Sequence, residues 1–298
     1  MNFTEIKLKI AEEAGLDPTT HDTKLGVWAN SAYLYIAGMF NWPWLMKSGI
    51  VQTVTDIETG TATIAAGGTA LTFSSGPAVS VAADYMIQFD EESDDWYEIS
   101  AHTAGETTAT ISPAFVGSSA YTAGSYICRK IRYSLASDAD KIISMKQAIT
   151  DQPIDVQDLR TMNRVLPDPT ETGSPDTATL LGLDSNNYWQ IQFYPIPDDI
   201  INIFYQYYQK VAALTGTDTP IMPVQWHPSI VFVALATFGH AYMDDDRIQS
   251  AVFRAKEILT TMVRQFSPTP NKLAVMQAWD QDFTRPRYNK NTDTGYEA

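Results

Sequence analysis

Residues 84–100 read DYMIQFDEESDDWYEIS, and this stretch decides the fold that we expect for the middle of the chain. Its apolar residues alternate with other residues on both sides of a polar interval: Tyr85, Ile87 and Phe89 before it, Tyr97 and Ile99 after it. An alternation with a period of two is typical of strands that bury one face. The stretch therefore predicts two strands joined by the loop 90–95, which carries most of its carboxylates.

The acidic loop 90–95 does not resemble a calcium-binding loop, because it lacks the glycine, the alternating ligands and the distant bidentate glutamate of such loops. We interpret it as a solvated hairpin tip. A glycosidase would need one carboxyl group in an apolar cleft and a second at a fixed separation, and a sequence alone shows no cleft. No metal site and no catalytic carboxylate pair is therefore assigned here.

The remaining acidic and histidine residues also have structural interpretations. Asp244–Asp246 precede an expected helix, where anions complement the helix dipole, and Asp246 is placed to cap it. His240 and Asp244 lie one helical turn apart, but the other three histidines are scattered along the chain. A surface hydrogen bond is favoured over a zinc site.

The sequence on either side of the opening stretch predicts more strands. Residues 50–130 are rich in Thr, Val, Ile and Gly with short alternating runs, so four to six short strands are expected. Such a set favours a small β-barrel over an open sheet with bare edges.

Residues 131–210 predict a second β region. The run DKIISMKQAI (140–149) is compatible with a strand alone or with a strand that leads into a short helix. RVLPDPTETGSPDTATLLG (164–182) is typical of a loop. YWQIQFYPIPDDIINIFYQYYQKV (188–211) predicts a β-hairpin with Pro195 and Pro197 at its turn, paired with residues 131–145.

Helical periodicity marks both ends of the chain. The first helix has apolar residues at four-residue spacing and a Gly15 stop, and the second has Asp22 as its expected N-cap. A third helix is expected with Pro228 at its first position, and a fourth from Arg247 to Phe266. The apolar stripes, in chain order, are Ile6, Ile10 and Ala14; Leu25, Trp28, Ala29, Ala32, Ile36 and Phe40; Val231, Ala234, Leu235, Phe238 and Tyr242; and Ile248, Ala251, Val252, Ala255, Leu259, Met262 and Phe266.

The predicted fold class is therefore α+β, with a helical lobe made from the N- and C-terminal segments, an inserted all-β region that contains a small β-barrel, and an extended C-terminal arm. The arm is polar with few apolar residues, so it cannot bury enough surface to order itself. The expected domains are the first part of the helical lobe (1–49), the barrel (50–130), the second β region (131–210), the second part of the lobe (211–267) and the arm (268–298).

The composition and the motifs of the chain limit the classes of function that we consider. The 298 residues include 20 Lys and Arg against 35 Asp and Glu, a formal net charge of −15 that disfavours tight DNA binding. One cysteine excludes an internal disulfide and cysteine-based metal sites. No secretory signal and no apolar run long enough to span a bilayer is found, so we expect a soluble chain made in the cytoplasm. No catalytic or cofactor motif occurs, so neither an enzyme nor a cofactor is expected.

The order of the chain resembles the head-to-tail adaptor, or connector, proteins of tailed bacteriophages, especially those with short tails. The similar stretches cover most of residues 25–266, and the chain departs from the family in the lengths of its acidic hairpin and of the loop 161–187. These stretches are WANSAYLYIAGMFNWPWL (28–45), GTATIAAGGTALTFSS (60–75), DYMIQFDEESDDWYEISAH (84–102), TTATISPAFVGSSAYTAGSYICRK (107–130) and the segment 191–246.

The resemblance implies a structural virion protein at the head–tail interface. It would form a homo-oligomeric, twelve-fold ring that joins the portal to the tail nozzle or other tail proteins and lines the channel through which DNA is ejected. Genome DNA would pass without specific binding. In the C-terminal arm, the residues expected to bind the portal are Trp279, Phe283, Arg285 and Arg287.

Two other readings stay open. A carbohydrate-binding or depolymerising phage tail protein would need solvent-facing aromatic residues on the barrel, such as Trp96, and a cleft with two carboxyl groups. A minor tail or capsid structural protein other than the adaptor would differ from it in position and stoichiometry in the particle.

Overall fold

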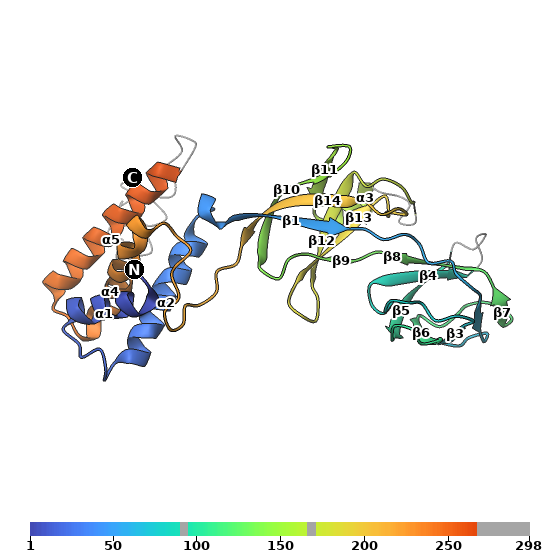
Figure 1. Cartoon of the computed structure of the whole chain (residues 1–298), viewed down its shortest axis with the longest axis horizontal. Helices are drawn as coiled ribbons and strands as arrows, with labels where there is room; N and C mark the ends of the chain where they lie inside the picture. Colours follow the sequence, from blue (N-terminus) through green and yellow to red (C-terminus); the bar gives the residue numbers. More distant parts are fainter. Residues whose placement is uncertain (90–94, 166–170, 267–298) are drawn as a thin grey trace, which may run out of the picture. The chain divides into compact units, whose positions relative to one another are not determined.

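The computed structural model describes residues 1–89, 95–165 and 171–266. The fold is mixed α and β with mostly sheet, so the predicted class is confirmed at this level (Figure 1). The α-helices of the described residues are α1 (Phe3–Ala14), α2 (Asp22–Met39), α3 (Leu159–Val165), α4 (His227–Phe238) and α5 (Asp245–Phe266), with the 3₁₀ turns η1 (Pro43–Leu45), η2 (Val224–Trp226) and η3 (Gly239–Ala241).

The strands of the described residues form two sheets, taken in turn below. They are β1 (Met46–Gln52), β2 (Ala62–Ile64), β3 (Ala70–Phe73), β4 (Tyr85–Phe89), β5 (Trp96–His102), β6 (Thr108–Ser112), β7 (Tyr121–Gly124), β8 (Tyr126–Lys130), β9 (Tyr133–Ser134), β10 (Ala139–Gln147), β11 (Pro153–Gln157), β12 (Thr177–Leu183), β13 (Trp189–Tyr194) and β14 (Asn202–Gln209).

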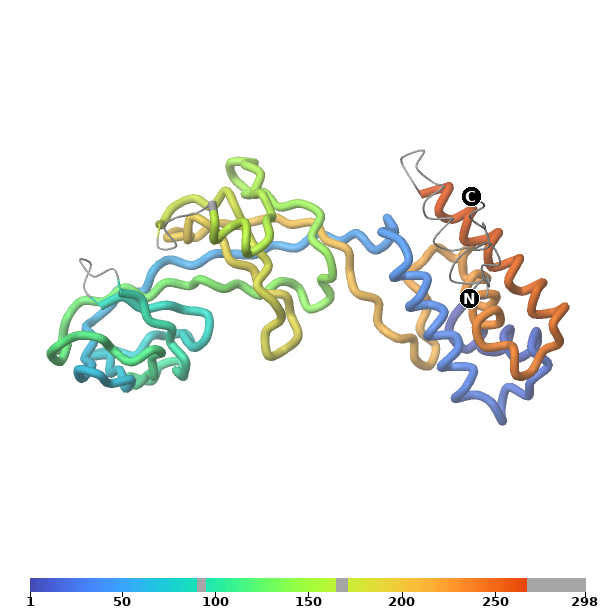
Figure 2. The backbone as a smooth tube through the Cα atoms, turned by 180° about the vertical axis from the view of Figure 1, so that it is seen from behind, coloured from blue at the N-terminus to red at the C-terminus, as the bar shows by residue number. Residues whose placement is uncertain are grey.

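The chain divides into two compact units. The helical unit contains residues 1–45 and the described residues from 211 onward, and the β unit contains residues 46–210. Within the helical unit, the first helices lie beside the last ones in both views (Figures 1 and 2). Residues 1–45 and 211–266 therefore share one core.

The first helix forms as its sequence predicts. A capping box closes its N-terminus, because the Glu5 backbone N–H donates to Asn2 Oδ1 (2.9 Å) and the Asn2 backbone N–H donates to Glu5 Oε2 (3.0 Å). Gly15 ends the helix in the left-handed conformation, with φ of 69°. The prediction for the second helix is wrong in one detail: His21 precedes it, and Asp22 is its first residue, paired with Lys7.

Helix α4 lies at the centre of the helical unit, in contact with α1, α2 and α5. Trp28 of α2 stacks on Phe238 of α4, with ring centroids 5.9 Å apart and an interplanar angle of 10°. Pro228 is the second residue of α4 and not the first, since His227 precedes it. The predicted stripe of α5 is buried at Ile248, Ala251, Ala255, Leu259 and Met262, whereas Val252 and Phe266 are partly exposed and Val263 is buried in addition.

One sheet of the β unit has the strand order β1-β14-β10-β11-β12-β13-β9 among the described residues. Run 140–149 forms a strand to Gln147, and the predicted pairing of 131–145 is confirmed, since β10 pairs with β14 and β9 with β13. The predicted hairpin is wrong, because β13 and β14 do not pair with each other. After Pro195 the chain pairs instead with residues 171–173 through the backbone of Ile196.

The loop predicted over 164–182 is also wrong in part. Residues 177–183 form β12, which pairs in parallel with β11 and antiparallel with β13. Ala178 and Thr179 are fully buried in it. Turn-forming residues just before this strand hid it in the sequence, because Gly173, Pro175 and Asp176 signal a loop.

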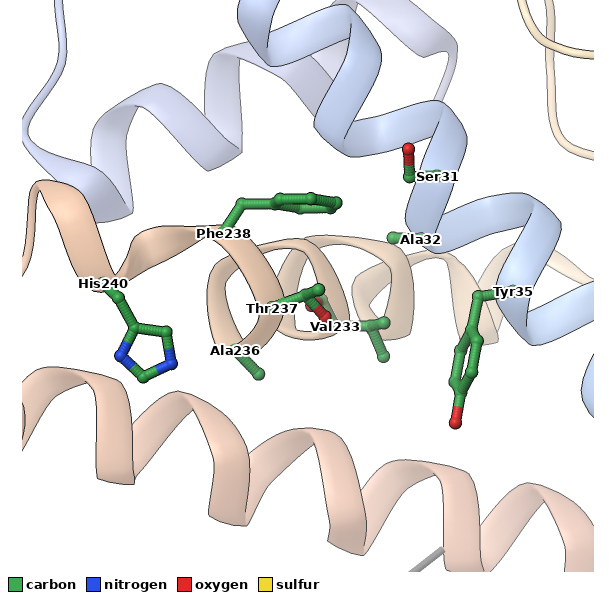
Figure 3. Close-up of a pocket in the computed structure, with 8 residues that line it drawn as sticks. All are labelled: Ser31, Ala32, Tyr35, Val233, Ala236, Thr237, Phe238 and His240. Atoms are coloured by element: carbon green, nitrogen blue, oxygen red, sulfur yellow. The ribbon is translucent and has the colours of Figure 1, made fainter. Parts of the chain in front are cut away.

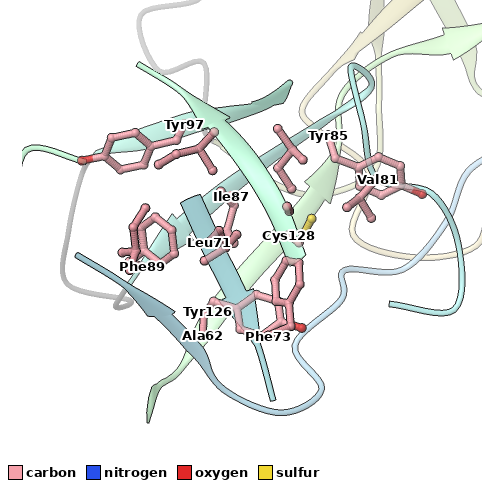
Figure 4. Packing of buried hydrophobic residues seen from close by; sticks show 14 residues of the cluster. Ala62, Leu71, Phe73, Val81, Tyr85, Ile87, Phe89, Tyr97, Tyr126 and Cys128 are labelled. Atoms are coloured by element: carbon pink, nitrogen blue, oxygen red, sulfur yellow. The ribbon is translucent and has the colours of Figure 1, made fainter. Parts of the chain in front are cut away.

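The other sheet has the strand order β7-β2-β3-β6-β5-β4-β8 and forms a nearly closed barrel. The two strands predicted from the opening stretch are confirmed as β4 and β5, which pair with each other. Figure 4 shows their inward side chains meeting those of the other strands in one core. Cys128, the single cysteine, is fully buried there.

Candidate interaction surfaces

The carboxylates do not gather into a site in the described part of the chain. Strands β4 and β5 flank the acidic loop, of which residues 90–94 lie outside the described residues, while Asp95 is exposed. Across the residues that are described, no group of three or more His, Cys, Asp or Glu side chains could hold a metal ion.

The acids before α5 act on the helix itself. Asp244 Oδ1 accepts a hydrogen bond from the Arg247 backbone N–H (2.9 Å), so Asp244 caps the helix. The prediction that Asp246 provides the cap is wrong by two residues, since Asp246 lies in the first helical turn. Asp244 and Asp246 both place a negative charge near the N-terminus of α5, where it complements the helix dipole.

Trp96, the aromatic residue of the barrel considered for sugar stacking, is only partly exposed. The guanidinium carbon of Arg129 lies 5.0 Å from the centroid of its ring. Arg129 Nε also donates to Asp56 Oδ2 (2.8 Å). Burial raises the pKa of Asp56, and this outweighs the opposing effect of the Arg129 hydrogen bond and charge. The contact with Arg129 therefore occupies one face of the Trp96 ring.

An exposed apolar face lies on β1 and β14. Met46 is 44% exposed, Ile50 is 58% exposed and Phe204 is 38% exposed. Ile50 and Phe204 are direct partners in the register of the two strands. Their neighbours Val51 and Ile203 point to the other face and are buried. Large apolar side chains that gather on one surface mark a site of association.

Strand β1 also ends its sheet with an accessible edge. In the described residues it pairs with β14 alone, over seven residues, without a proline or a register shift. The opposite end of the sheet is β9, which has only two residues. Proteins commonly shorten, bend, cover or charge an edge strand to prevent pairing with another chain; within the described residues β1 is neither short nor bent, and it carries the exposed charge of Lys47.

The helical unit contains a half-open pocket between α2 and α4, with a volume of about 490 Å³ (Figure 3). Ala32 and Ala236 line this space but are almost completely buried, and Phe238 forms one wall. Its remaining lining residues are Ser31, Tyr35, Val233, Thr237 and His240. The same unit carries Phe253, which is 68% exposed on α5 and is the most exposed aromatic residue among those described.

The sequence predicted few of these surfaces. The expected portal-binding residues Trp279, Phe283, Arg285 and Arg287 lie outside the described residues. A signal for Phe253 does exist, since it is a large apolar residue outside the helical stripe of α5. No comparable signal marks the pocket, because Ala32 and Ala236 are far apart in the sequence.

No protein-family model matches the chain, and no curated protein matches it either. Among the described residues, no helix combines the length and the apolar character needed to cross a bilayer.

Proposed function

We propose that this protein is a structural subunit of a bacteriophage virion that forms a ring between the portal and the tail and lines the DNA channel. In this proposal the helical lobe from the two chain ends, the inserted β region and the arm 268–298 form separate contacts. The resemblance over most of residues 25–266 suggests the family.

The observation that carries the proposal is that one chain has two different exposed apolar surfaces. One is the face of β1 and β14 with Met46, Ile50 and Phe204, and the other includes Phe253 on α5. A closed ring of identical subunits needs two unlike, complementary faces on each subunit. Single exposed apolar residues such as Phe253 are common on soluble proteins, so Ile50 and Phe204, side by side on two strands, are the stronger part of this observation.

The net charge of −15 is consistent with a DNA channel. A wall that is poor in lysine and arginine offers few contacts to phosphates, so a polyanion would move past it without being held. In the proposed ring, part of this negative surface faces the lumen.

The carbohydrate-binding alternative receives less support. Sugar stacking needs an open aromatic face, and the face of Trp96 beside Arg129 is occupied. The test is tryptophan fluorescence of the chain and of Trp96→Phe during titration with host surface glycans. We expect no difference that depends on the glycan, and quenching that is lost in the variant would favour the alternative.

Electron microscopy of the full chain, alone and mixed with the portal protein encoded by the same phage, tests the proposed function. We expect rings that cap one end of the portal. Monomers that do not bind the portal would contradict the proposal. Stoichiometry in purified particles separates an adaptor from another minor tail protein, because an adaptor ring supplies many copies at the head–tail interface.

A further inference from the structure

We propose that Tyr288, in the C-terminal arm (268–298) of this chain, inserts its side chain into a pocket on the barrel. The pocket lies between segments 54–59 and 75–79 of the β unit, is half open and has a volume of about 460 Å³. We call it the barrel pocket. The inference goes beyond the proposed function and does not require that the chain forms a ring.

The barrel pocket has two exposed walls and a buried floor. One wall is segment 54–59, whose two lining threonines are exposed. The other wall is segment 75–79, in which Val79 is 49% exposed. The floor consists of Tyr85 and Tyr126, which are 5% and 2% exposed. The recess is therefore open to solvent between its walls and closed at its base.

The two tyrosines of the floor differ in their hydrogen bonds. The Tyr126 hydroxyl donates to the Thr59 carbonyl oxygen (2.9 Å), which ties the floor to one wall. The Tyr85 hydroxyl has no hydrogen-bond partner within the described residues, and its oxygen is not enclosed by the protein. Figure 4 shows this hydroxyl pointing away from the packed cluster. Burial raises the pKa of Tyr85 to about 12, so the group stays a neutral phenol that can donate and accept.

The lining selects an apolar group with one polar tip. None of the described lining residues is charged, so a phosphate or a metal ion would find no counter-charge. Val54 and Ile57 on one wall and Val79 on the other offer apolar side chains, and the floor offers the free hydroxyl of Tyr85. The ring of a tyrosine combines an apolar body with a polar end in this way.

Exposed acidic residues lie beside both walls. Glu58 follows the lining residue Ile57, and the backbone of Glu106 lies against the lining residue Gly76. Neither carboxylate forms an ion pair within the described residues. An acidic rim favours an aromatic residue that has basic neighbours in its own sequence.

The arm contains one tyrosine with such neighbours. The run RPRYNK (285–290) places Tyr288 among three basic residues and no acidic one, although the whole chain has a net charge of −15. The other aromatic residues of the arm, Trp279, Phe283 and Tyr296, are each next to an acidic residue. Tyr288 therefore matches both the lining and the rim.

An occupant from the same polypeptide does not need a high affinity. A connected segment reaches an effective concentration on the order of millimolar when the connection spans the distance. The residues between Phe266 and Tyr288 can extend over roughly 70 Å. A contact through a single ring is then populated, and the expected portal anchors Trp279 and Phe283 remain outside it.

Disulfide trapping in the full chain tests the contact. Val79→Cys at the rim is combined with Asn289→Cys, next to Tyr288, and the pair is oxidised under mild conditions. Val116→Cys with Asn289→Cys is the matched control, because Val116 is a 67% exposed valine of the β unit that does not line the barrel pocket. The native Cys128 is buried and does not compete.

We expect the pair at 79 and 289 to form its disulfide at least roughly tenfold faster than the control pair, because docking of Tyr288 brings the two cysteines together. Adding Tyr288→Ala should abolish this difference, and Tyr296→Ala should not. Adding Tyr85→Phe should slow trapping by roughly fivefold through the loss of one hydrogen bond. It should leave the thermal unfolding temperature unchanged, because the hydroxyl has no partner in the folded chain.

Trapped monomers and trapped dimers both support the contact and differ only in which copy supplies the arm. Equal rates for the two cysteine pairs would refute it. Trapping that is unaffected by Tyr288→Ala would show that the ring is not the occupant. A Tyr85→Phe variant that unfolds at a lower temperature and traps at the unchanged rate would assign its hydroxyl a structural role. Each of these failures would leave the proposed ring at the portal standing.

Discussion

The ring of Tyr205 lies across Gly49, its register partner on the neighbouring strand β1. A Cβ atom added to Gly49 would lie 2.4 Å from Tyr205 Cζ, closer than real Cβ contacts allow. The Tyr205 hydroxyl accepts a hydrogen bond from the Ala136 backbone N–H (2.9 Å), so the ring is tied at its far end. The edge strand β1 therefore depends on a glycine at this position.

Replacing Gly49 with alanine should destabilise the β unit by about 1–3 kcal/mol, because the added methyl group displaces a ring held at its far end. Urea unfolding measures the change. Gly38→Ala is the control, because nothing lies within 4 Å of a Cβ at that helical position, and it should leave stability unchanged or slightly raised. An equal loss in both variants would contradict the packing argument.

The side chain of Asn30 on α2 makes two hydrogen bonds to the backbone of Leu214, in the segment that follows the β unit. Its Nδ2 donates to the Leu214 carbonyl oxygen (3.0 Å), and its Oδ1 accepts from the Leu214 backbone N–H (2.7 Å). Asn30→Ala should lower the free energy of unfolding of the helical unit by about 2 kcal/mol, since two backbone groups lose their partners. Asn30→Asp keeps the acceptor and should cost less. A null effect of Asn30→Ala would contradict the assignment.

Two carboxyl groups of the β unit should give opposite pH dependences of stability. Burial raises the folded-state pKa of Asp56, so its contribution is present below the unfolded pKa and is lost as the pH rises through the folded pKa. Burial also acts to raise the pKa of Asp138, but hydrogen bonds from Lys47 and Tyr207 outweigh it and lower this pKa. The contribution of Asp138 is present above the unfolded pKa and is lost as the pH falls through the folded pKa.

The measurement is urea unfolding of the chain and of Asp56→Asn and Asp138→Asn from about pH 3 to pH 7. Relative to Asp56→Asn, the unchanged chain should lose stability as the pH rises. Relative to Asp138→Asn, it should gain stability over the same range. Slopes of the same sign would show that the environment of one of these groups is misassigned.

Substitutions in the C-terminal arm (268–298) test its proposed contact with the portal. In the proposed function, the combined variant Trp279→Ala and Phe283→Ala should still form rings but should bind the portal more weakly, because it lacks the two aromatic residues proposed to anchor that contact. Co-sedimentation with the portal measures this. Arg285→Glu and Arg287→Glu should act in the same direction. Truncation after Phe266 that leaves attachment intact would contradict a role of the arm.

The helices and strands that depend on local periodicity could be predicted from the sequence. Ile6 and Ile10 recur at helical spacing, and Tyr85 and Ile87 alternate, so the helix and the strand were both predictable from neighbouring residues. Strand partners were predictable only in part: the pairing of β4 with β5 was predicted, but alternation identifies a buried face and does not say which strand lies beside it. Pro195 was therefore placed in a hairpin turn, although the chain pairs with residues 171–173 at that point.

The candidate surfaces were harder to predict for the same reason. The residues that line the pocket come from α2 and from α4 with the turn after it, and these segments meet only when α2 packs on α4. The helix caps were misplaced by one or two residues at Asp22 and Asp246, because acidic residues are favoured both at the cap and in the first turn.

The burial of Cys128 makes this chain convenient for site-directed labelling. Because the single native thiol is enclosed in the barrel, and burial raises its pKa, it should react slowly with maleimides. A cysteine introduced on the surface would then carry a spin label or fluorophore alone, without removal of the native residue. Distances between such labels on different copies of the chain would thus test the proposed ring directly.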